Sequence, residues 1–144
     1  MREILFRGKT GNGVWVEGYL CKSVAHIETF HQNVVVDTIE VYDGKSYLNI
    51  MYRNVDTNTI GQFAGLTDEQ GNRIFEGDIV EPVLIQGTHS GFSWGRQVVV
   101  FDRGAFCLKN RRDEITPMCN YSVNVKFKVL GNIHDNPELI EVTA

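Results

Sequence analysis

Short apolar runs broken by glycines constrain the fold of this chain more than any other feature of its sequence. The segment from Gly61 to Val80 shows the pattern most clearly, with interruptions at Gly65, Gly71 and Gly77. Glycine adopts positive φ angles at low steric cost, so it is favoured where a strand turns or bends. The chain has 14 glycines but only three prolines in 144 residues, a balance typical of short strands joined by turns. We therefore predict an all-β, or mostly β, protein.

Two segments alternate between apolar and polar residues with the period of a β-strand. Val14 to Leu20 follows a glycine-bearing turn at residues 9–13, and we expect Glu3 to Arg7 to pair with it as a hairpin. The segment from Tyr121 to Ile133 places lysines on one face and apolar residues on the other, namely Val123, Val125, Phe127 and Val129. This alternation predicts a half-buried strand at the edge or outside of a sheet.

Other segments give more local expectations. Lys22 to Gln32 could form a short helix or a loop, since its apolar residues have roughly helical spacing. Residues 67–72 predict a reverse turn, and Gly77 is expected to mark a bulge or a close backbone approach within a strand from Arg73 to Val80. The glycine-rich stretch at residues 86–95 predicts a long, exposed hairpin loop.

The second half of the chain continues with turn signals. Residues 102–104 predict a tight turn between two strands, and Asn110 to Glu114 predicts a charged loop. Near the end, Asn136 is expected to cap a short helical turn that has Pro137 in its first position.

The charge of the chain does not indicate a polyanion-binding protein by itself. Its formal net charge is −4, and most lysines and arginines are scattered singly along the sequence. Only the stretch from Arg103 to Arg112 and the pair Lys126 and Lys128 are mildly enriched in basic residues. Since phosphate neutralisation by basic residues supplies most non-specific affinity, nucleic-acid binding remains an open alternative.

Cysteine usage and hydropathy indicate a compartment. Cys21, Cys107 and Cys119 cannot all pair within one chain and form no C-x-x-C element, so we expect buried free thiols in a reducing cytoplasm. The first seven residues become polar too soon for a signal peptide. No apolar run approaches the roughly 20 residues that span a bilayer, so no membrane association is expected.

The sequence offers no convincing metal, cofactor or nucleophile site. His26 and His31 are five positions apart, which misses the spacing that places two ligands on one helical face, so exposed loop histidines are the simpler interpretation. Residues 91–95 match the letters of the G-x-S-x-G nucleophile elbow around Ser93. That motif needs a helix after it, and the residues that follow predict a strand instead. We expect a mobile loop tip that gives Ser93 no rigid positioning.

Three carboxylates cluster near the central turn. Glu69, Glu76 and Asp78 could serve acid–base catalysis only if their surroundings separated their pKa values. Asp68 and Asp78 are more simply explained as turn formers that accept hydrogen bonds from nearby backbone amides. We therefore expect no enzymatic activity and assign no catalytic, cofactor-binding or metal-binding residue.

The candidate partner-binding residues are Phe92, Trp94, Arg96 and Arg103. Together with Tyr121, the two loop aromatics could stack against the bases of a single-stranded nucleic acid beside the arginines. The same aromatics could instead fill a core or a subunit contact, which is their more common use.

Several separated stretches carry a family resemblance. They are the opening MREILFR, the run GQFAGLTD at residues 61–68 with Gly71 and IFEGDIV at 74–80, the turn DRGAF at 102–106, and the closing VLGNIHDNPEL at 129–139. In this order they resemble the YopX protein family, which is encoded by bacteriophages and prophages.

The resemblance implies a fold and a setting but no activity. It implies an N-terminal β region at residues 1–58, followed by an SH3-like β-barrel with its helical turn at residues 59–144. It also implies a homo-oligomer in the cytoplasm of an infected or lysogenic bacterium. No functional residues follow from it.

Three hypotheses about function follow. The first is a non-enzymatic phage or prophage accessory protein that acts by binding, as a homo-oligomer, with a host or phage protein as its partner. The second is a single-stranded nucleic-acid-binding module, since small barrels often offer a groove for single strands. The third is a small hydrolase that uses the carboxylates near the central turn or the Ser93 loop.

Overall fold

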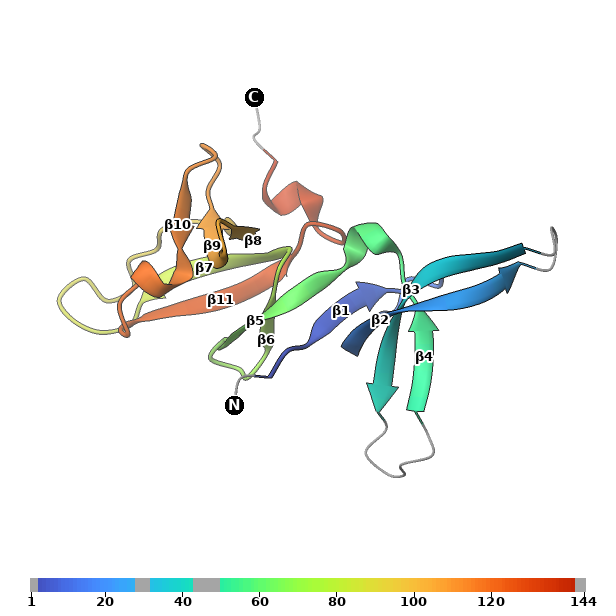
Figure 1. Cartoon of the computed structure of the whole chain (residues 1–144). Coiled ribbons are helices and arrows are strands. Elements are labelled where there is room, and N and C mark those ends of the chain that lie inside the picture. The colour runs from blue at the N-terminus through green and yellow to red at the C-terminus, as the bar shows by residue number, and fades with distance from the viewer. Residues whose placement is uncertain (1–2, 28–31, 43–49, 142–144) are drawn as a thin grey trace. The chain divides into compact units, whose positions relative to one another are not determined.

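The structure, a computed structural model, describes residues 3–27, 32–42 and 50–141 (Figure 1). In this part of the chain the strands form two antiparallel sheets, and the helical elements are three short 3-10 turns. The prediction of a mostly β protein is therefore confirmed. The described residues include no helix that is long and apolar enough to cross a membrane. The chain divides into two compact units, residues 1–63 and 64–144, which we describe separately.

The first unit is built on a long antiparallel sheet. Its strands lie in the order β4-β3-β2-β1, and the first residues of β5 pair with β1. Their bounds are β1 Phe6–Lys9, β2 Trp15–Ile27, β3 Gln32–Tyr42, β4 Ile50–Asn54 and β5 Gly61–Thr67, with the 3-10 turn η1 at Thr57–Thr59. The expected hairpin between β1 and β2 is confirmed, although β1 begins at Phe6 rather than at Glu3.

The segment after Lys22 is a strand where the sequence predicted a short helix or a loop. The pairing of β2 with β3 continues without a break from Tyr19 opposite Glu40 to Ile27 opposite Gln32. The extended conformation here follows from this pairing with β3, which lies outside any local stretch of sequence. The part of the helix prediction that covers residues 28–31 lies outside the described residues.

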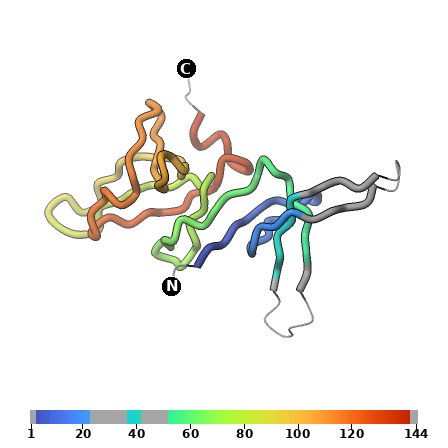
Figure 2. The backbone as a smooth tube through the Cα atoms, viewed as in Figure 1, coloured from blue at the N-terminus to red at the C-terminus, as the bar shows by residue number. Residues whose placement is uncertain are grey.

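The second unit holds a five-stranded sheet in the order β10-β9-β8-β7-β11. Its elements are β6 Arg73–Phe75, β7 Asp78–Leu84, β8 Gln97–Asp102, β9 Ala105–Lys109, β10 Ile115–Pro117, η2 Met118–Asn120, β11 Val125–Asn132 and η3 Pro137–Leu139. Figure 2 shows the backbones of β7 and β11 side by side, as their antiparallel pairing requires. In the described part of the chain no pairing between the end strands β10 and β11 is seen, and no closed barrel is detected.

The alternation of the last strand is confirmed and its start is corrected. Val125 and Phe127 are buried in the core while Lys126 and Lys128 are exposed, and β11 lies at the edge of the sheet. Val123 was expected on the buried face but precedes the strand and is 90% exposed. The buried residues of this core are Ile74, Val80, Val99, Leu108, Met118, Val125 and Phe127.

Gly77 ends one strand instead of bulging within one. It has a φ of 91° in a tight turn between β6 and β7, and its amide donates to the carbonyl of Val99. Its carbonyl accepts from the amide of Ile133, so both backbone groups are paired outside the turn. Of the two alternatives for Gly77, the bulge is wrong because this glycine reverses the chain, and the close approach of neighbouring backbone at Val99 and Ile133 is confirmed. The bulge of this sheet lies in β11 instead, between Val129 and Gly131.

The terminal helical turn is confirmed, but its cap differs from the prediction. Pro137 occupies the first position of η3, as expected. The side chain of Asn136 makes no capping hydrogen bond and instead accepts from the amide of Asn132 at 3.2 Å. Of the cysteines expected to be buried, Cys107 is buried, Cys21 is half-buried and Cys119 is exposed. Burial, with the nearby charge of Asp102, raises the pKa of the Cys107 thiol.

Candidate partner-binding groove

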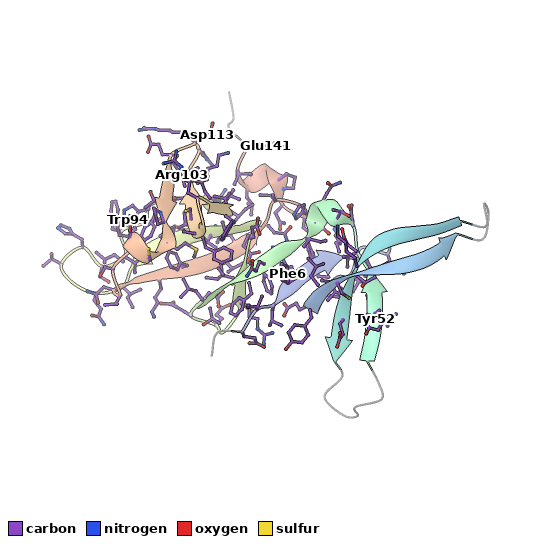
Figure 3. The ribbon with its side chains drawn as sticks, viewed as in Figure 1. Phe6, Tyr52, Trp94, Arg103, Asp113 and Glu141 are labelled. Atoms are coloured by element: carbon purple, nitrogen blue, oxygen red, sulfur yellow. The ribbon has the colours of Figure 1, made fainter. Side chains whose placement is uncertain are left out.

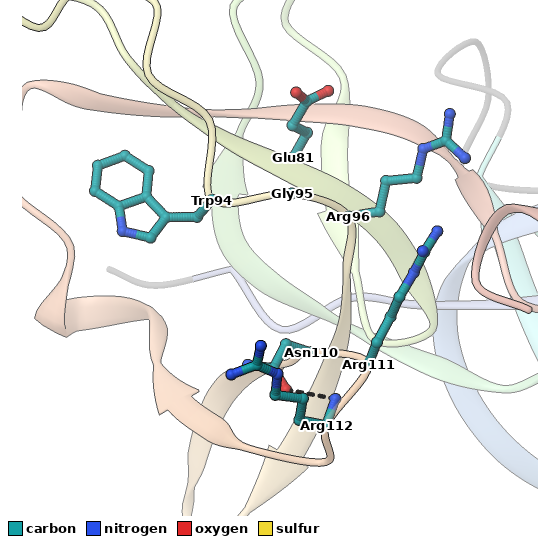
Figure 4. A pocket seen from close by; sticks show the side chains of 7 residues that line it. All are labelled: Glu81, Trp94, Gly95, Arg96, Asn110, Arg111 and Arg112. Carbon is teal, nitrogen blue, oxygen red and sulfur yellow. Dashed lines mark hydrogen bonds between the residues drawn. The ribbon is translucent and has the colours of Figure 1, made fainter. Parts of the chain in front are cut away.

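A hollow of about 560 Å³ on the second unit gathers basic and aromatic side chains from three segments of the chain. We call it the arginine groove, and its lining residues are Glu81, Trp94, Gly95, Arg96, Asn110, Arg111 and Arg112 (Figure 4). Its volume lies within the range of small-molecule sites, about 300–1,000 Å³. Three arginines against one glutamate give the lining a formal excess of positive charge in a chain whose net charge is −4.

Trp94 forms the aromatic wall of the groove. Its ring makes edge contacts with Phe92, at a centroid distance of 4.9 Å, and with Tyr121, at 5.7 Å. Tyr121 in turn contacts the core residue Phe127 at 5.4 Å, so a chain of aromatic rings links the groove to the hydrophobic core. Trp94 remains 41% exposed at the surface of this unit (Figure 3). The indole is therefore both anchored and accessible.

The backbone around Trp94 is fixed to the neighbouring strand β7. The amide of Trp94 donates to the carbonyl of Pro82 at 3.1 Å, and the amide of Leu84 donates to the carbonyl of Phe92 at 2.9 Å. The buried side chain of Gln97 also donates to the carbonyl of Trp94. The glycines of this loop predicted that its backbone gives Ser93 no rigid positioning. This expectation is wrong for residues 92–94, because their backbone pairs with β7.

Arg111 and Arg112 are presented by a loop with fixed geometry. At residues 110–114 the amide of Asn110 donates to the carbonyl of Glu114, and the amide of Asp113 donates back to the carbonyl of Asn110. The side-chain oxygen of Asn110 accepts from the amides of Arg112, at 2.9 Å, and Glu114, at 3.0 Å (dashed line for Arg112 in Figure 4). The charged loop that the sequence predicted is thus a tightly bonded hairpin connection.

The same five-residue loop occurs three times among the residues that the structure describes, at residues 10–14, 68–72 and 110–114. In each, the first amide donates to the fifth carbonyl, and the fourth amide donates to the first carbonyl. In each, the fifth amide donates to the first side chain, which is Thr10, Asp68 or Asn110. The fourth residue always has a positive φ, and it is glycine in the first two loops but Asp113, at 62°, in the third.

Arg96 and Glu81 are the other two charged residues that line the groove. The guanidinium of Arg96 donates to the carbonyl of Leu139 at 3.4 Å, which places Arg96 between β8 and the terminal turn η3. Glu81 accepts a hydrogen bond of 2.6 Å from the hydroxyl of Ser93. The hydroxyl of Ser93 also accepts from the amide of Gly95, and β8, rather than a helix, follows. This arrangement differs from a nucleophile elbow.

The structure brings three of the four sequence-predicted residues together. Phe92, Trp94 and Arg96 lie in one segment at the groove, whereas Arg103 lies beyond the other end of β8. The strand between Arg96 and Arg103 separates them by about 20 Å, at about 3.3 Å per residue. Arg103 is a turn residue with a φ of 49°, and its side chain lies 3.8 Å from the carboxylate of Asp102.

Sequence analysis missed Arg111 and Arg112 as site residues. The basic character of the stretch from Arg103 to Arg112 is visible in the sequence, but no local pattern predicts that the loop lies near Trp94. A signal was present, because Asn110 and Asp113 occupy the positions that Asp68 and Gly71 occupy in the better recognised turn. Asn at the first position and a residue that tolerates positive φ at the fourth are typical of such connections.

Of the three carboxylates near the central turn, Asp78 has a structural role. One oxygen of the buried Asp78 accepts from the amide of Phe75 at 2.8 Å, while Glu69 is exposed in the 68–72 loop. Among the described residues, no group of three histidine, cysteine or acidic side chains is placed to hold a metal ion. His26 lies in β2, so the helical spacing considered for His26 and His31 does not apply, and His31 lies outside the described residues.

The fold and groove define a two-unit, mostly β protein with an open basic and aromatic surface. A family model described as YopX protein matches residues 14–141, and the chain belongs to this family. The match includes the groove and most of both units. Comparison with curated proteins finds no match.

Proposed function

We propose that this chain acts by binding and that the arginine groove receives an anionic partner. The observation that carries the proposal is the convergence of Arg96, Arg111 and Arg112 on one hollow, from two segments separated by the β8–β9 hairpin. Guanidinium groups present planar, permanently charged donors that match carboxylates, phosphates and sulfates. The hydrogen bonds of the 110–114 loop fix the backbone that carries two of these arginines before any partner arrives.

A catalytic alternative has less support. A hydrolase based on Asp78 would have to use a side chain that already accepts a backbone amide in a buried turn. Ser93 has a carboxylate in reach, since its hydroxyl donates to Glu81, but a strand follows it where a nucleophile elbow needs a helix, and its hydroxyl also accepts from the amide of Gly95. Both groups serve the local structure of the unit, and this supports a binding role.

Binding of a polyanion tests the proposal. Labelled heparin carries sulfates without bases, so it probes the charge of the groove alone. At low salt we expect an Arg111→Ala, Arg112→Ala double variant to bind heparin about tenfold or more weakly than the wild type. Arg103→Asn is the matched control, because it removes one positive charge outside the groove and Asn tolerates the positive φ of that position. Equal losses in the two variants would reject a localised site.

The proposal includes a homo-oligomer in the cytoplasm of a phage-infected or lysogenic bacterium, with a host or phage protein as a further partner. Tyr19 and Tyr52 support self-association, since both are exposed and lie in one cross-strand row on either side of Glu40. The free thiols of Cys21, Cys107 and Cys119 fit a reducing compartment. Light scattering that gives the mass of one chain at micromolar concentration would contradict the oligomer.

The finer fold proposal is an SH3-like barrel in the second unit. It is supported by five antiparallel strands in the order β10-β9-β8-β7-β11, with the 3-10 turn η2 just before the last strand. Nuclear Overhauser contacts between backbone protons of β10 and β11 would establish closure. Their absence, with all other strand contacts present, would leave an open sheet.

A further inference from the structure

We infer that the anionic partner of the arginine groove is a single-stranded nucleic acid, with a base against Trp94 and phosphates on the arginines. This inference rests on the proposed function and names the ligand class of the same site. The groove combines two chemistries that a single strand presents together, a flat π-surface and a repeating anion. Each is recognised by different residues, so the two parts can be tested separately.

The aromatic half of the argument concerns Trp94. Its ring is held by edge contacts to Phe92 and Tyr121, so little side-chain entropy remains to be lost when a ligand stacks on it. Trp94 also lines a second, more apolar hollow of about 440 Å³ together with Leu84, Tyr121 and Val125. The indole therefore separates a basic hollow from an apolar one. A nucleotide needs this juxtaposition, because its base is weakly polar and its phosphate is charged.

Competing anionic ligands use only part of this surface. An acidic peptide would pair with the arginines but has no general need of an exposed indole. A nucleic-acid duplex would offer its phosphates, while its base faces stay stacked inside the helix. A single strand can turn a base towards Trp94 and place neighbouring phosphates near Arg96 and the 110–114 loop.

Glu81 is the group that opposes an anion in the groove. Its carboxylate lines the hollow and is held by the hydroxyl of Ser93. Glu81→Gln keeps an oxygen that can accept this hydrogen bond and removes the negative charge. We therefore expect Glu81→Gln to bind oligonucleotides more tightly than the wild type, with the largest difference at low salt.

The experiment uses the full chain with Trp15→Phe, so that Trp94 is the one tryptophan that reports binding by fluorescence. The ligands are an oligothymidylate of about eight nucleotides and an abasic strand of the same length and charge. We expect oligothymidylate to quench Trp94 and to bind about 5- to 100-fold more tightly than the abasic strand. Variants of Trp94 lack tryptophan in this background, so their binding is followed by the fluorescence anisotropy of a labelled strand. Trp94→Ala should remove the difference between the two strands. Trp94→Phe should keep part of it, and thermal unfolding of both variants shows whether they are folded.

The charge half of the inference predicts a salt dependence. If three arginines contact phosphates, the logarithm of the affinity should fall with the logarithm of salt concentration with a slope of about −2. Each single change to alanine at Arg96, Arg111 or Arg112 should lower the magnitude of this slope by about 0.7. Arg103→Asn should leave the slope at its wild-type value.

The outcomes separate the two proposals. Heparin binding that depends on Arg111 and Arg112, with equal affinity for oligothymidylate and the abasic strand, would overturn the nucleic-acid inference and leave the proposed function in place. A duplex of equal charge that binds more tightly than the single strand would overturn the inference as well. If neither heparin nor oligothymidylate binding responds to the arginine changes, both proposals fail.

Discussion

The amide of Phe75 donates a 2.8 Å hydrogen bond to the carboxylate of Asp78 across the buried turn between β6 and β7. Asp78 is 2% exposed and Phe75 is 1% exposed, so this bond is shielded from water. It spans Gly77, whose positive φ reverses the chain. Asp78, one of the three carboxylates considered for acid–base chemistry in the sequence, thus closes a turn at the edge of the core.

Replacing Asp78 tests this structural role. Asp78→Ala leaves the amide of Phe75 without its acceptor in a buried site, so we expect a loss of about 1–3 kcal/mol in the free energy of unfolding. Asp78→Asn is the matched control, because its side-chain oxygen can still accept the amide, and it should lose less. Urea unfolding followed by circular dichroism measures both. Equal stability of the alanine variant and the wild type would contradict the assignment.

The three five-residue loops make a second prediction. Asp113 adopts the positive φ that Gly13 and Gly71 adopt in the equivalent loops. This conformation costs a non-glycine residue about 1–2 kcal/mol, part of which is offset by the greater chain entropy of an unfolded glycine. Asp113→Gly also loses an exposed ion pair with Lys109, which contributes little. We expect Asp113→Gly to raise the free energy of unfolding by up to about 1 kcal/mol.

Gly71→Ala provides the reverse change for comparison with Asp113→Gly. A Cβ at Gly71 would meet no atom within 4 Å, so its effect reports the backbone conformation alone. We expect a loss of about 1 kcal/mol in urea unfolding. If Asp113→Gly is less stable than the wild type while Gly71→Ala is unchanged, the two loops are not equivalent. The affinity of the arginine groove should be retained in both variants.

Much of this fold was predictable because the alternation and turn residues of short segments agree with the way the strands pair. The alternation of β11 and the hairpin turns at residues 67–72 and 102–104 follow from side-chain periodicity and from glycines at positive φ. The strand at residues 22–27 was missed because its extended conformation depends on pairing with β3, which no local window contains.

The candidate site was predictable only in part. Phe92, Trp94 and Arg96 are close in sequence, so their proximity in space required no knowledge of the fold. Arg111 joins them because the antiparallel strands β8 and β9 return the chain to the groove. This return can be predicted only when the lengths of both strands are known. Arg103 was misplaced for the same reason, since β8 carries it to the opposite end of the sheet.

The pH dependence of stability supplies a third prediction, through Asp68. Burial tends to raise the pKa of this carboxyl, but hydrogen bonds from the side chain and amide of Asn72 and from the amides of Gln70 and Val129 outweigh it and lower the pKa. The folded state therefore favours the ionised form. The contribution of the ionised Asp68 to the free energy of unfolding is complete above about pH 4, where the carboxyl is also ionised in the unfolded chain. This contribution is lost as the pH falls through the lowered pKa of the folded state.

Asp68→Asn is the variant that isolates this effect. Asn110 performs the same role in the equivalent loop, so the asparagine should preserve the turn while it removes the titrating group. We expect the wild type to be more stable than Asp68→Asn at neutral pH, and the difference to shrink as the pH is lowered below about 4. Urea unfolding at a series of pH values measures the difference. A gap that stays constant down to the lowest pH would show that the carboxylate charge does not contribute.

The close approach of strands in the first unit gives the last prediction. A Cβ at Gly18 would lie 2.9 Å from the carbonyl carbon of Glu40 and 3.0 Å from Cγ2 of Ile39, which is completely buried. Neither the backbone nor this core side chain can move aside without disturbing the pairing of β2 with β3. We expect Gly18→Ala to destabilise the protein by about 1–3 kcal/mol, as overpacking of a core does. Gly11→Ala is the control, because a Cβ there meets nothing within 4 Å and its φ is not positive. Thermal unfolding in which the two variants lose equal stability would show that the strands at Gly18 have room for a methyl group.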